Sequence, residues 1–185
     1  MQKISTLFMR DPQDRRRLTR EVHRRCQWVI DGEGVAKRKY DGKCVILDEF
    51  GNWWARLEVR PGEEPPPGFC TIAEDRGIRV GAEPLATSPW AKYFDEAIEL
   101  YRPPGSQRPL PGTYELYGPE INGNPEDVSV HSLVYHSDAP LLDNSVRSYD
   151  SLREYLSDLP YEGIVWFHDD GRKAKIKRRD VMDAP

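Results

Sequence analysis

The arginine-rich segment over residues 10–27 carries a helical spacing of apolar residues. Three of them stand four positions apart: Leu18, Val22 and Cys26. A spacing of four places them on one narrow stripe of a helix. Asp11 followed by Pro12 is a typical helix start, with the cap at the aspartate and proline at the first helical position. The pattern therefore predicts a basic helix over 10–27.

From Gly34 onward the pattern is typical of strands. Three segments rich in strand-forming residues follow one another, separated by the turns Asp41-Gly42 and Phe50-Gly51-Asn52: 35–40, 43–50 and 53–59. This order predicts a meander of three strands joined by tight turns. The proline-rich segment 61–68 that follows predicts an exposed loop.

The clearest helix begins at Ser88-Pro89 and ends before two prolines. Its apolar residues fall on one face: Trp90, Phe94, Ala97, Ile98 and Tyr101. A shorter helix is predicted over 148–156 with three residues turned inward: Leu152, Tyr155 and Leu156. Further strands are predicted over 113–118 and 131–136, and a closing hairpin over 162–177. Strands in runs with few helices predict an α+β fold of mostly antiparallel sheet.

Composition limits the classes of protein that fit. The chain has 185 residues, which predicts a single domain over 1–185 with the basic segment 1–33 packed on it. No apolar run approaches the roughly 20 residues of a membrane span, and we find no secretory signal. Three cysteines without paired spacing disfavour a disulfide framework and a structural zinc site. We therefore expect a cytoplasmic protein with no membrane partner.

Charge is distributed unevenly along the chain, although the net charge is only −4. Residues 1–44 hold 12 Lys and Arg against 6 Asp and Glu, and residues 172–185 hold 6 against 2. The segment between them holds 9 against 23. Basic ends that converge would bind an anion, whereas the alternative is a solvated surface of uneven charge.

The closing hairpin predicts a phosphate-binding face. If Asp170-Gly171 is a two-residue turn, directly opposed residues share a face of the ribbon. That face would then carry five residues: Glu162, Ile164, Trp166, Lys175 and Lys177. Two lysines beside an aromatic ring and a carboxylate suit a nucleotide phosphate. The alternative is an edge hairpin whose lysines prevent aggregation, and a register slip of one residue would break the shared face.

A second candidate is Lys39, which stands at the end of a strand just before Asp41-Gly42. A lysine held at the rim of a sheet suits a covalent nucleophile. Free lysine is protonated at neutral pH, so it needs neighbouring cations or a metal ion to lower its pKa. The pattern K-x-D-G alone is a weak signal.

Together these residues resemble the nucleotidyltransferase superfamily of ATP-dependent ligases and capping enzymes. Five elements match its motifs in order: the nucleophile motif K-x-D-G at 39–42, the arginine of the following strand at Arg56, h-E-h-h-G at 114–118, E-G-h-V at 162–165 and K-x-K at 175–177. The chain is most similar to a branch of small RNA ligases with a vertebrate relative. The phrases shared with that branch are K-x-D-G-x-C, W-A-R-L, E-L-x-G-x-x-I-N-G-N-P and E-G-I-V-W.

The resemblance implies an ATP-dependent RNA ligase that joins RNA 5′-phosphate and 3′-hydroxyl ends through a lysyl–AMP intermediate. It implies Lys39 as the nucleophile, with Lys175 and Lys177 on the α-phosphate. It also implies metal-binding roles, for Mg²⁺ or Mn²⁺, at Glu162 and Glu115. The remaining nucleotide-binding residues implied are Asp41, Gly42 and Arg56.

The resemblance further implies a nucleotidyltransferase fold of mostly antiparallel sheets flanked by helices, without an appended OB-fold. RNA would then be bound by the catalytic core or by a partner, and the candidates on the core are the N-terminal arginines: Arg15, Arg16, Arg17, Arg20, Arg24 and Arg25. The two histidines His131 and His136 are expected to be hydrogen-bonded in the interior, with a phosphate or metal role as the alternative.

Three alternatives stay open. A capping guanylyltransferase that uses GTP and a minimal DNA ligase share these motifs. A module that binds nucleic-acid ends without catalysis would have the same fold, although intact Lys39, Glu115, Glu162 and Lys175 argue against it.

Overall fold

The computed structural model describes residues 4–102, 105 and 108–182, and its contacts divide the chain into two compact units. We call Asp41–Asp138 the central unit. The terminal unit consists of Ile4–Tyr40 and the chain from Ala139 onward. Both combine antiparallel sheet with a few helices, which confirms the α+β class predicted from the sequence.

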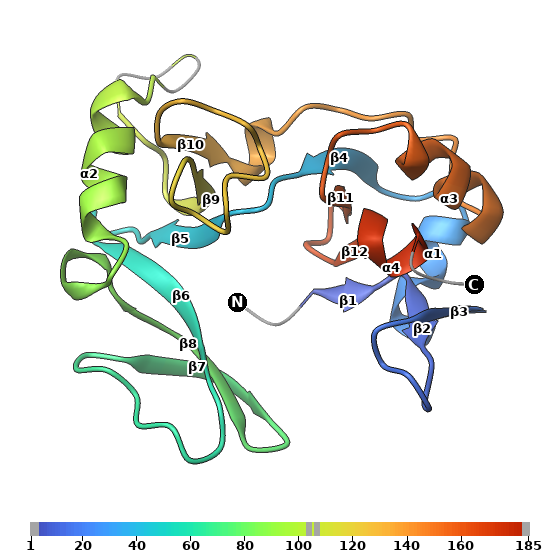
Figure 1. Ribbon diagram of the computed structural model, residues 1–185, viewed down its shortest axis with the longest axis horizontal. Coiled ribbons are helices and arrows are strands. Elements are labelled where there is room, and N and C mark those ends of the chain that lie inside the picture. The colour runs from blue at the N-terminus through green and yellow to red at the C-terminus, as the bar shows by residue number, and fades with distance from the viewer. Residues whose placement is uncertain (1–3, 103–104, 106–107, 183–185) are drawn as a thin grey trace. The chain divides into compact units, whose positions relative to one another are not determined.

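The terminal unit contains a four-stranded sheet in the order β1-β12-β11-β4 and a two-stranded sheet, β2-β3 (Figure 1). Only the β1–β12 pair is parallel in the four-stranded sheet. The elements of this unit are β1 Ser5–Thr6, β2 Phe8–Arg10, β3 Leu18–Val22, a 3-10 turn Arg24–Cys26, α1 Gln27–Ile30, β4 Val35–Lys39, α3 Tyr149–Ser157, β11 Gly163–Phe167, β12 Lys173–Lys177 and α4 Arg178–Met182.

One face of this four-stranded sheet forms the core of the terminal unit. Ile164 and Trp166 alternate along β11 and are fully buried there. Leu152 and Leu156 of α3 belong to the same cluster, and Tyr155 packs against it. The Ser148 hydroxyl caps α3 by accepting a hydrogen bond from the Ser151 N–H. The short helix predicted over 148–156 is therefore confirmed.

The central unit contains a six-stranded antiparallel sheet in the order β10-β9-β5-β6-β8-β7. Its elements are β5 Lys43–Leu47, β6 Trp53–Val59, β7 Cys70–Asp75, β8 Ile78–Pro84, a 3-10 turn Leu85–Thr87, α2 Ala91–Leu100, β9 Gly112–Tyr117, β10 Ser132–Tyr135 and a 3-10 turn His136–Asp138.

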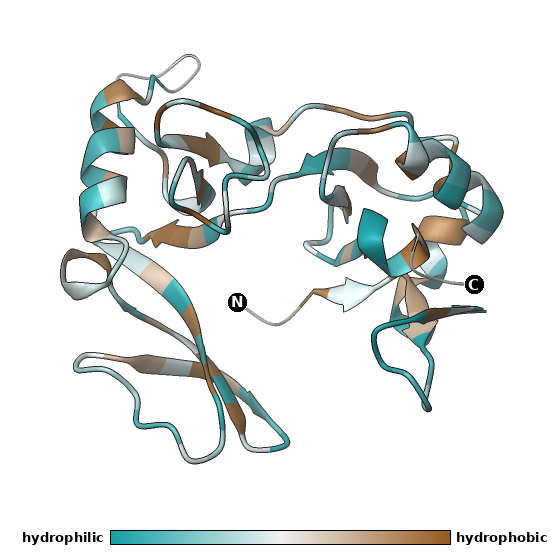
Figure 2. Cartoon of the chain, in the orientation of Figure 1, coloured by the Kyte–Doolittle hydropathy of each residue, from teal (hydrophilic) through white to brown (hydrophobic). Residues whose placement is uncertain are grey.

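Helix α2 packs on one face of this sheet, as its apolar stripe predicts. Phe94 and Ala97 are buried, and the other three residues of the stripe pack against the same core. Figure 2 shows the alternation of hydrophobic and hydrophilic residues along the helix. The strands predicted over 113–118 and 131–136 are present as β9 and β10. No helix among the described residues is long and apolar enough to cross a membrane.

The predicted meander of three strands is wrong at its first turn. β5 and β6 pair as a hairpin, but β4 pairs with β11 in the other sheet. The chain leaves the terminal unit at Tyr40 and enters the central unit at Asp41. The Asp41 and Gly42 N–H groups donate to Glu126 and Glu115, so carboxylates rather than a hairpin partner satisfy this turn. The strands β7 and β8 were not predicted.

The predicted basic helix over 10–27 is also wrong. β2 and β3 form an antiparallel hairpin there, and helical structure begins only at Arg24. A spacing of four is a multiple of two, so it fits a strand as well as a helix. The Asp11 carboxylate accepts from the Gln13 N–H and starts a turn in the hairpin loop instead of capping a helix.

The closing hairpin exists, but its register differs by one residue from the prediction. The loop has three residues rather than two, because His168 N–H donates to the Arg172 carbonyl and Gly171 adopts a φ of +88°. Val165 therefore lies opposite Lys175, and Gly163 lies opposite Lys177. Ile164 and Trp166, predicted beside the lysines, face the core instead.

Candidate active site

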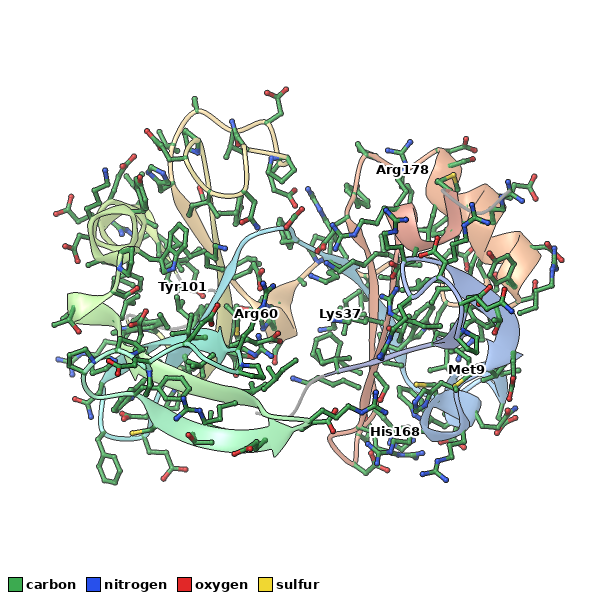
Figure 3. The ribbon with its side chains drawn as sticks, turned by 60° about the horizontal axis from the view of Figure 1, so that its bottom comes forward. Met9, Lys37, Arg60, Tyr101, His168 and Arg178 are labelled. Carbon is green, nitrogen blue, oxygen red and sulfur yellow. The ribbon has the colours of Figure 1, made fainter. Side chains whose placement is uncertain are left out.

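The second face of the four-stranded sheet is rich in lysine. Opposed residues of antiparallel strands share a face, so the register defines three rows on it. The rows, each running β4–β11–β12, are Val35–Phe167–Lys173, Lys37–Val165–Lys175 and Lys39–Gly163–Lys177. Figure 3 shows His168 at one end of the hairpin, Arg178 at the other and Lys37 beside the strands between them. We call this surface the lysine face.

Glu162 provides a buried carboxylate to the last row. One of its oxygens pairs with the Lys39 ammonium and the other with the Lys177 ammonium. The Glu162 side chain is only 8% exposed, and the two lysine side chains are 17% and 18% exposed. Lys39 also donates to the Tyr40 carbonyl at 3.1 Å. The structure therefore brings together three of the predicted residues, with Lys175 one row away.

Gly163 makes this arrangement possible. It stands between Lys39 and Lys177 in the row, so the side chain it lacks would lie between theirs. A Cβ at this position would overlap the carbonyl oxygen of Ile176 and lie 2.9 Å from the Lys177 Cα. The E-G pair thus has a geometric reason, because the glycine permits close approach of β12.

The two lysines determine the charge state of Glu162. Burial by itself raises the pKa of the carboxyl group. The charges and hydrogen bonds of Lys39 and Lys177 act in the opposite direction and hold the pKa below its ordinary value of 4.5. Glu162 is therefore a carboxylate at neutral pH.

This lowered pKa predicts a pH-dependent contribution to stability. Because the folded-state pKa lies below the unfolded value, the contribution is complete above about pH 4.5 and is lost as the pH falls through the folded pKa. We expect the difference in unfolding free energy between wild type and Glu162→Gln to shrink as the pH falls below that value. Urea unfolding at neutral and acidic pH measures it, and a constant difference contradicts the assignment.

Glu115 organises a second cluster, which lies within the central unit. Its carboxylate is 8% exposed and accepts from the Gly42 N–H at 3.1 Å. Its other oxygen lies 2.9 Å from His136 Nε2, and His136 Nδ1 lies 2.8 Å from the Thr113 hydroxyl. A Cβ on Gly42 would overlap the Leu116 carbonyl oxygen, so only glycine fits beside β9 here.

The loop after β9 holds Asp41 in place. Asn122, at a φ of +52°, donates to the Asp41 carboxylate at 2.8 Å and to the Gly42 carbonyl at 3.2 Å. Glu126 accepts from the Asp41 N–H at 2.9 Å. The predicted Asp41 and Gly42 therefore lie in one hydrogen-bonded network with Glu115. The phrase E-L-x-G-x-x-I-N-G-N-P includes Asn122, whereas no sequence pattern pointed to Glu126.

The other predicted residues lie in different surroundings. Arg56 is on β6 and pairs with Glu58 at 3.0 Å. The N-terminal arginines are on the β2–β3 loop, on β3 and in the 3-10 turn after it, and most are exposed. Arg16 and Arg17 lie within ion-pair distance of Asp14. Arg20 pairs with Asp150.

The two histidines are hydrogen-bonded, as expected. His131 is buried, its Nδ1 lies 2.7 Å from Glu96 and its Nε2 lies 2.9 Å from Glu120. Gly118 is required beside it, since a Cβ there would lie 2.5 Å from the His131 ring. His136 is partly exposed and contacts Glu115, as described above.

Neither predicted metal ligand fits a resident divalent ion in this arrangement. Both oxygens of Glu162 already contact ammonium groups, and both oxygens of Glu115 already have hydrogen-bond partners. Among the described residues, no three His, Cys, Asp or Glu side chains form a metal-binding group. The metal-binding roles of Glu162 and Glu115 stay predictions.

Sequence analysis missed two lysines of the lysine face, Lys37 and Lys173. The signal was present, since lysines recur at every second position over 37–39 and 173–177. Alternate positions of a strand share a face, so the correct register makes the five lysines neighbours.

No family model matches this chain, and no curated protein matches it. The lysine face and the ordered motifs are therefore the observations that bear on the class of protein.

Proposed function

We propose that this protein is a nucleotidyltransferase of the ATP-dependent ligase class and that it joins RNA ends. The observation that carries the proposal is the row Lys39–Gly163–Lys177 with the Glu162 carboxylate between its lysines. It joins three of the family's motifs, of which the first, at 39–42, lies more than a hundred residues before the other two. Their meeting supports the resemblance.

Lys39 is the nucleophile in this proposal. Its ammonium is paired with Glu162 in the structure, so it must release a proton before the neutral amine attacks. The nitrogen then forms a bond to the α-phosphorus of ATP, the bond from that phosphorus to the bridging oxygen breaks, and pyrophosphate leaves. Lys175 and Lys177 provide positive charge for the phosphate oxygens as negative charge develops.

Two transfers complete the reaction. An oxygen of the RNA 5′-phosphate attacks the AMP phosphorus, the bond to the Lys39 nitrogen breaks as that nitrogen takes up a proton from solvent, and adenylated RNA forms. A 3′-hydroxyl then attacks the RNA 5′-phosphorus, loses its proton and expels AMP. The nucleotide-binding roles of Arg56 and Glu115, and the role of Asp41 and Gly42 in shaping the turn after the nucleophile, stay predictions from the resemblance.

Intact-mass spectrometry tests the proposal directly. Incubation with the magnesium salt of ATP is expected to add the mass of one AMP to the protein, and ATP should be preferred over GTP. Labelled RNA with a 5′-phosphate should then be joined to a 3′-hydroxyl end. A GMP adduct would indicate a capping enzyme, joining of DNA alone a DNA ligase, and no adduct at all a binding module without catalysis.

RNA binding is expected to involve the exposed arginines of the β2–β3 loop. Each contacted phosphate releases counterions, so affinity should fall steeply with salt concentration. Replacing Arg15, Arg16 and Arg17 together by alanine should weaken RNA binding and flatten the salt dependence. Fluorescence anisotropy of labelled RNA over a salt series measures both. Equal slopes for wild type and variant would mean that these arginines form only a solvated surface.

A further inference from the structure

Phe167 lies on the lysine face at the row farthest from Glu162. It stands between Val35 and Lys173 in that row. The Lys173 ammonium is 4.8 Å from the centre of the ring, and the Lys37 ammonium is 5.6 Å from it. Val35 beside it is 41% exposed, so the edge of this apolar pair reaches the surface. Two cations thus lie close to one aromatic ring.

The combination of ring and cations is typical of sites for single-stranded nucleic acid. A base stacks on an aromatic ring whatever its identity, and nearby lysines contact the phosphates on either side. Rows two residues apart along a strand are separated by about 7 Å. Lys37 and Lys175 share the next row, so the positive surface continues from Phe167 toward Lys39.

Three acidic groups on or near the lysine face have cationic partners. Glu33 and Asp170, at the hairpin end next to this row, both pair with Arg172. Glu162, two rows away, pairs with Lys39 and Lys177. These three carboxylates, which a polyanion on the lysine face would approach, therefore have their charge balanced by cationic partners.

We propose that Phe167, Lys37 and Lys173 form a subsite for one nucleotide of a single-stranded RNA end. The base stacks on Phe167, and the adjoining phosphates contact the two lysines. This inference deepens the proposed function, since it names where the RNA strand binds relative to Lys39 on the same sheet.

The test measures binding of a short, fluorescently labelled, single-stranded RNA with a 5′-phosphate, by anisotropy and without ATP. Phe167→Leu keeps an apolar side chain but removes the ring, and it should weaken binding about 5-fold or more. The same RNA with abasic sites keeps its phosphates, and for it Phe167→Leu should make little difference. If Phe167 had only a structural role, Phe167→Leu would weaken binding of both RNAs equally.

The lysines are tested by a second variant, Lys37→Gln with Lys173→Gln. It should reduce the slope of log affinity against log salt by up to about 1.4, since each phosphate contact to a single strand contributes about 0.7. The matched control is Lys92→Gln, because Lys92 also lies over an aromatic ring, 4.5 Å from the centre of Tyr93. This control should bind RNA as wild type does.

Several outcomes overturn the subsite. The first two are no RNA binding by wild type and unchanged RNA binding in both variants. The third is a Phe167→Leu variant that loses the AMP adduct but binds RNA as wild type does, which would assign the ring to ATP. Failure of the proposed function has a different signature. In that case wild type forms no AMP adduct, while the Phe167 and lysine variants still weaken RNA binding.

Discussion

Replacing Lys39 by alanine or by arginine is expected to abolish the AMP adduct completely. Alanine has no nitrogen to attack the α-phosphorus. Arginine keeps the positive charge but stays protonated at any accessible pH, so it pairs with Glu162 without acting as a nucleophile. Intact-mass spectrometry after incubation with ATP and magnesium measures the adduct, and peptide mapping locates it.

Two other lysines provide the controls for this experiment. Lys175→Ala should slow adduct formation by at least about 10²-fold without moving it, because Lys175 supplies charge to the phosphate and not the attacking atom. Lys92→Ala, in helix α2, should form the adduct at the wild-type rate. An adduct that maps to any lysine other than Lys39 contradicts the assignment of the nucleophile.

Glu162→Gln is expected to cause the largest loss of stability among single substitutions at the site. The change leaves the ammonium groups of Lys39 and Lys177 close together, partly buried and without their counter-charge. Removing one partner of a buried ion pair costs about 3–5 kcal/mol, and we expect the lower end because the lysine ends retain some exposure. Urea unfolding at neutral pH measures the loss.

A second substitution separates charge repulsion from lost packing. Glu162→Gln combined with Lys177→Met removes one of the two unpaired charges and should recover part of the stability. Asp150→Asn breaks the exposed pair with Arg20 and should leave the unfolding midpoint nearly unchanged. A double variant no more stable than Glu162→Gln alone would mean that the carboxylate does not act by separating the two lysines.

Local patterns predicted the elements that are defined by residues close together in the chain. The apolar stripes of α2 and α3 are short-range signals, and both helices lie where they were predicted. The strands around Glu115 and Glu162 were found for the same reason. Where one spacing fitted two structures, as with Leu18 and Val22, the pattern alone favoured the wrong one.

The geometry of the site depended on a one-residue difference in loop length and on the pairing of strands that are far apart in the chain. The sequence Asp169-Asp170-Gly171 allows a loop of two or three residues, and the choice decides whether Trp166 or Val165 lies beside Lys175. Nothing near Lys39 in the chain indicates that its strand pairs with β11 rather than with β5.

By itself the sequence determined the α+β class, most strands and the helices α2 and α3, and which residue types are available for phosphate chemistry. Only the tertiary structure decided that Lys39, Glu162 and Lys177 meet, that Asn122 and Glu126 hold the Asp41–Gly42 turn, and that Phe167 stands among lysines. The physical reason is that helix periodicity and capping act over a few residues. Strand pairing and ion-pair formation instead join residues by closing long loops, and their register follows from the packing of a whole sheet.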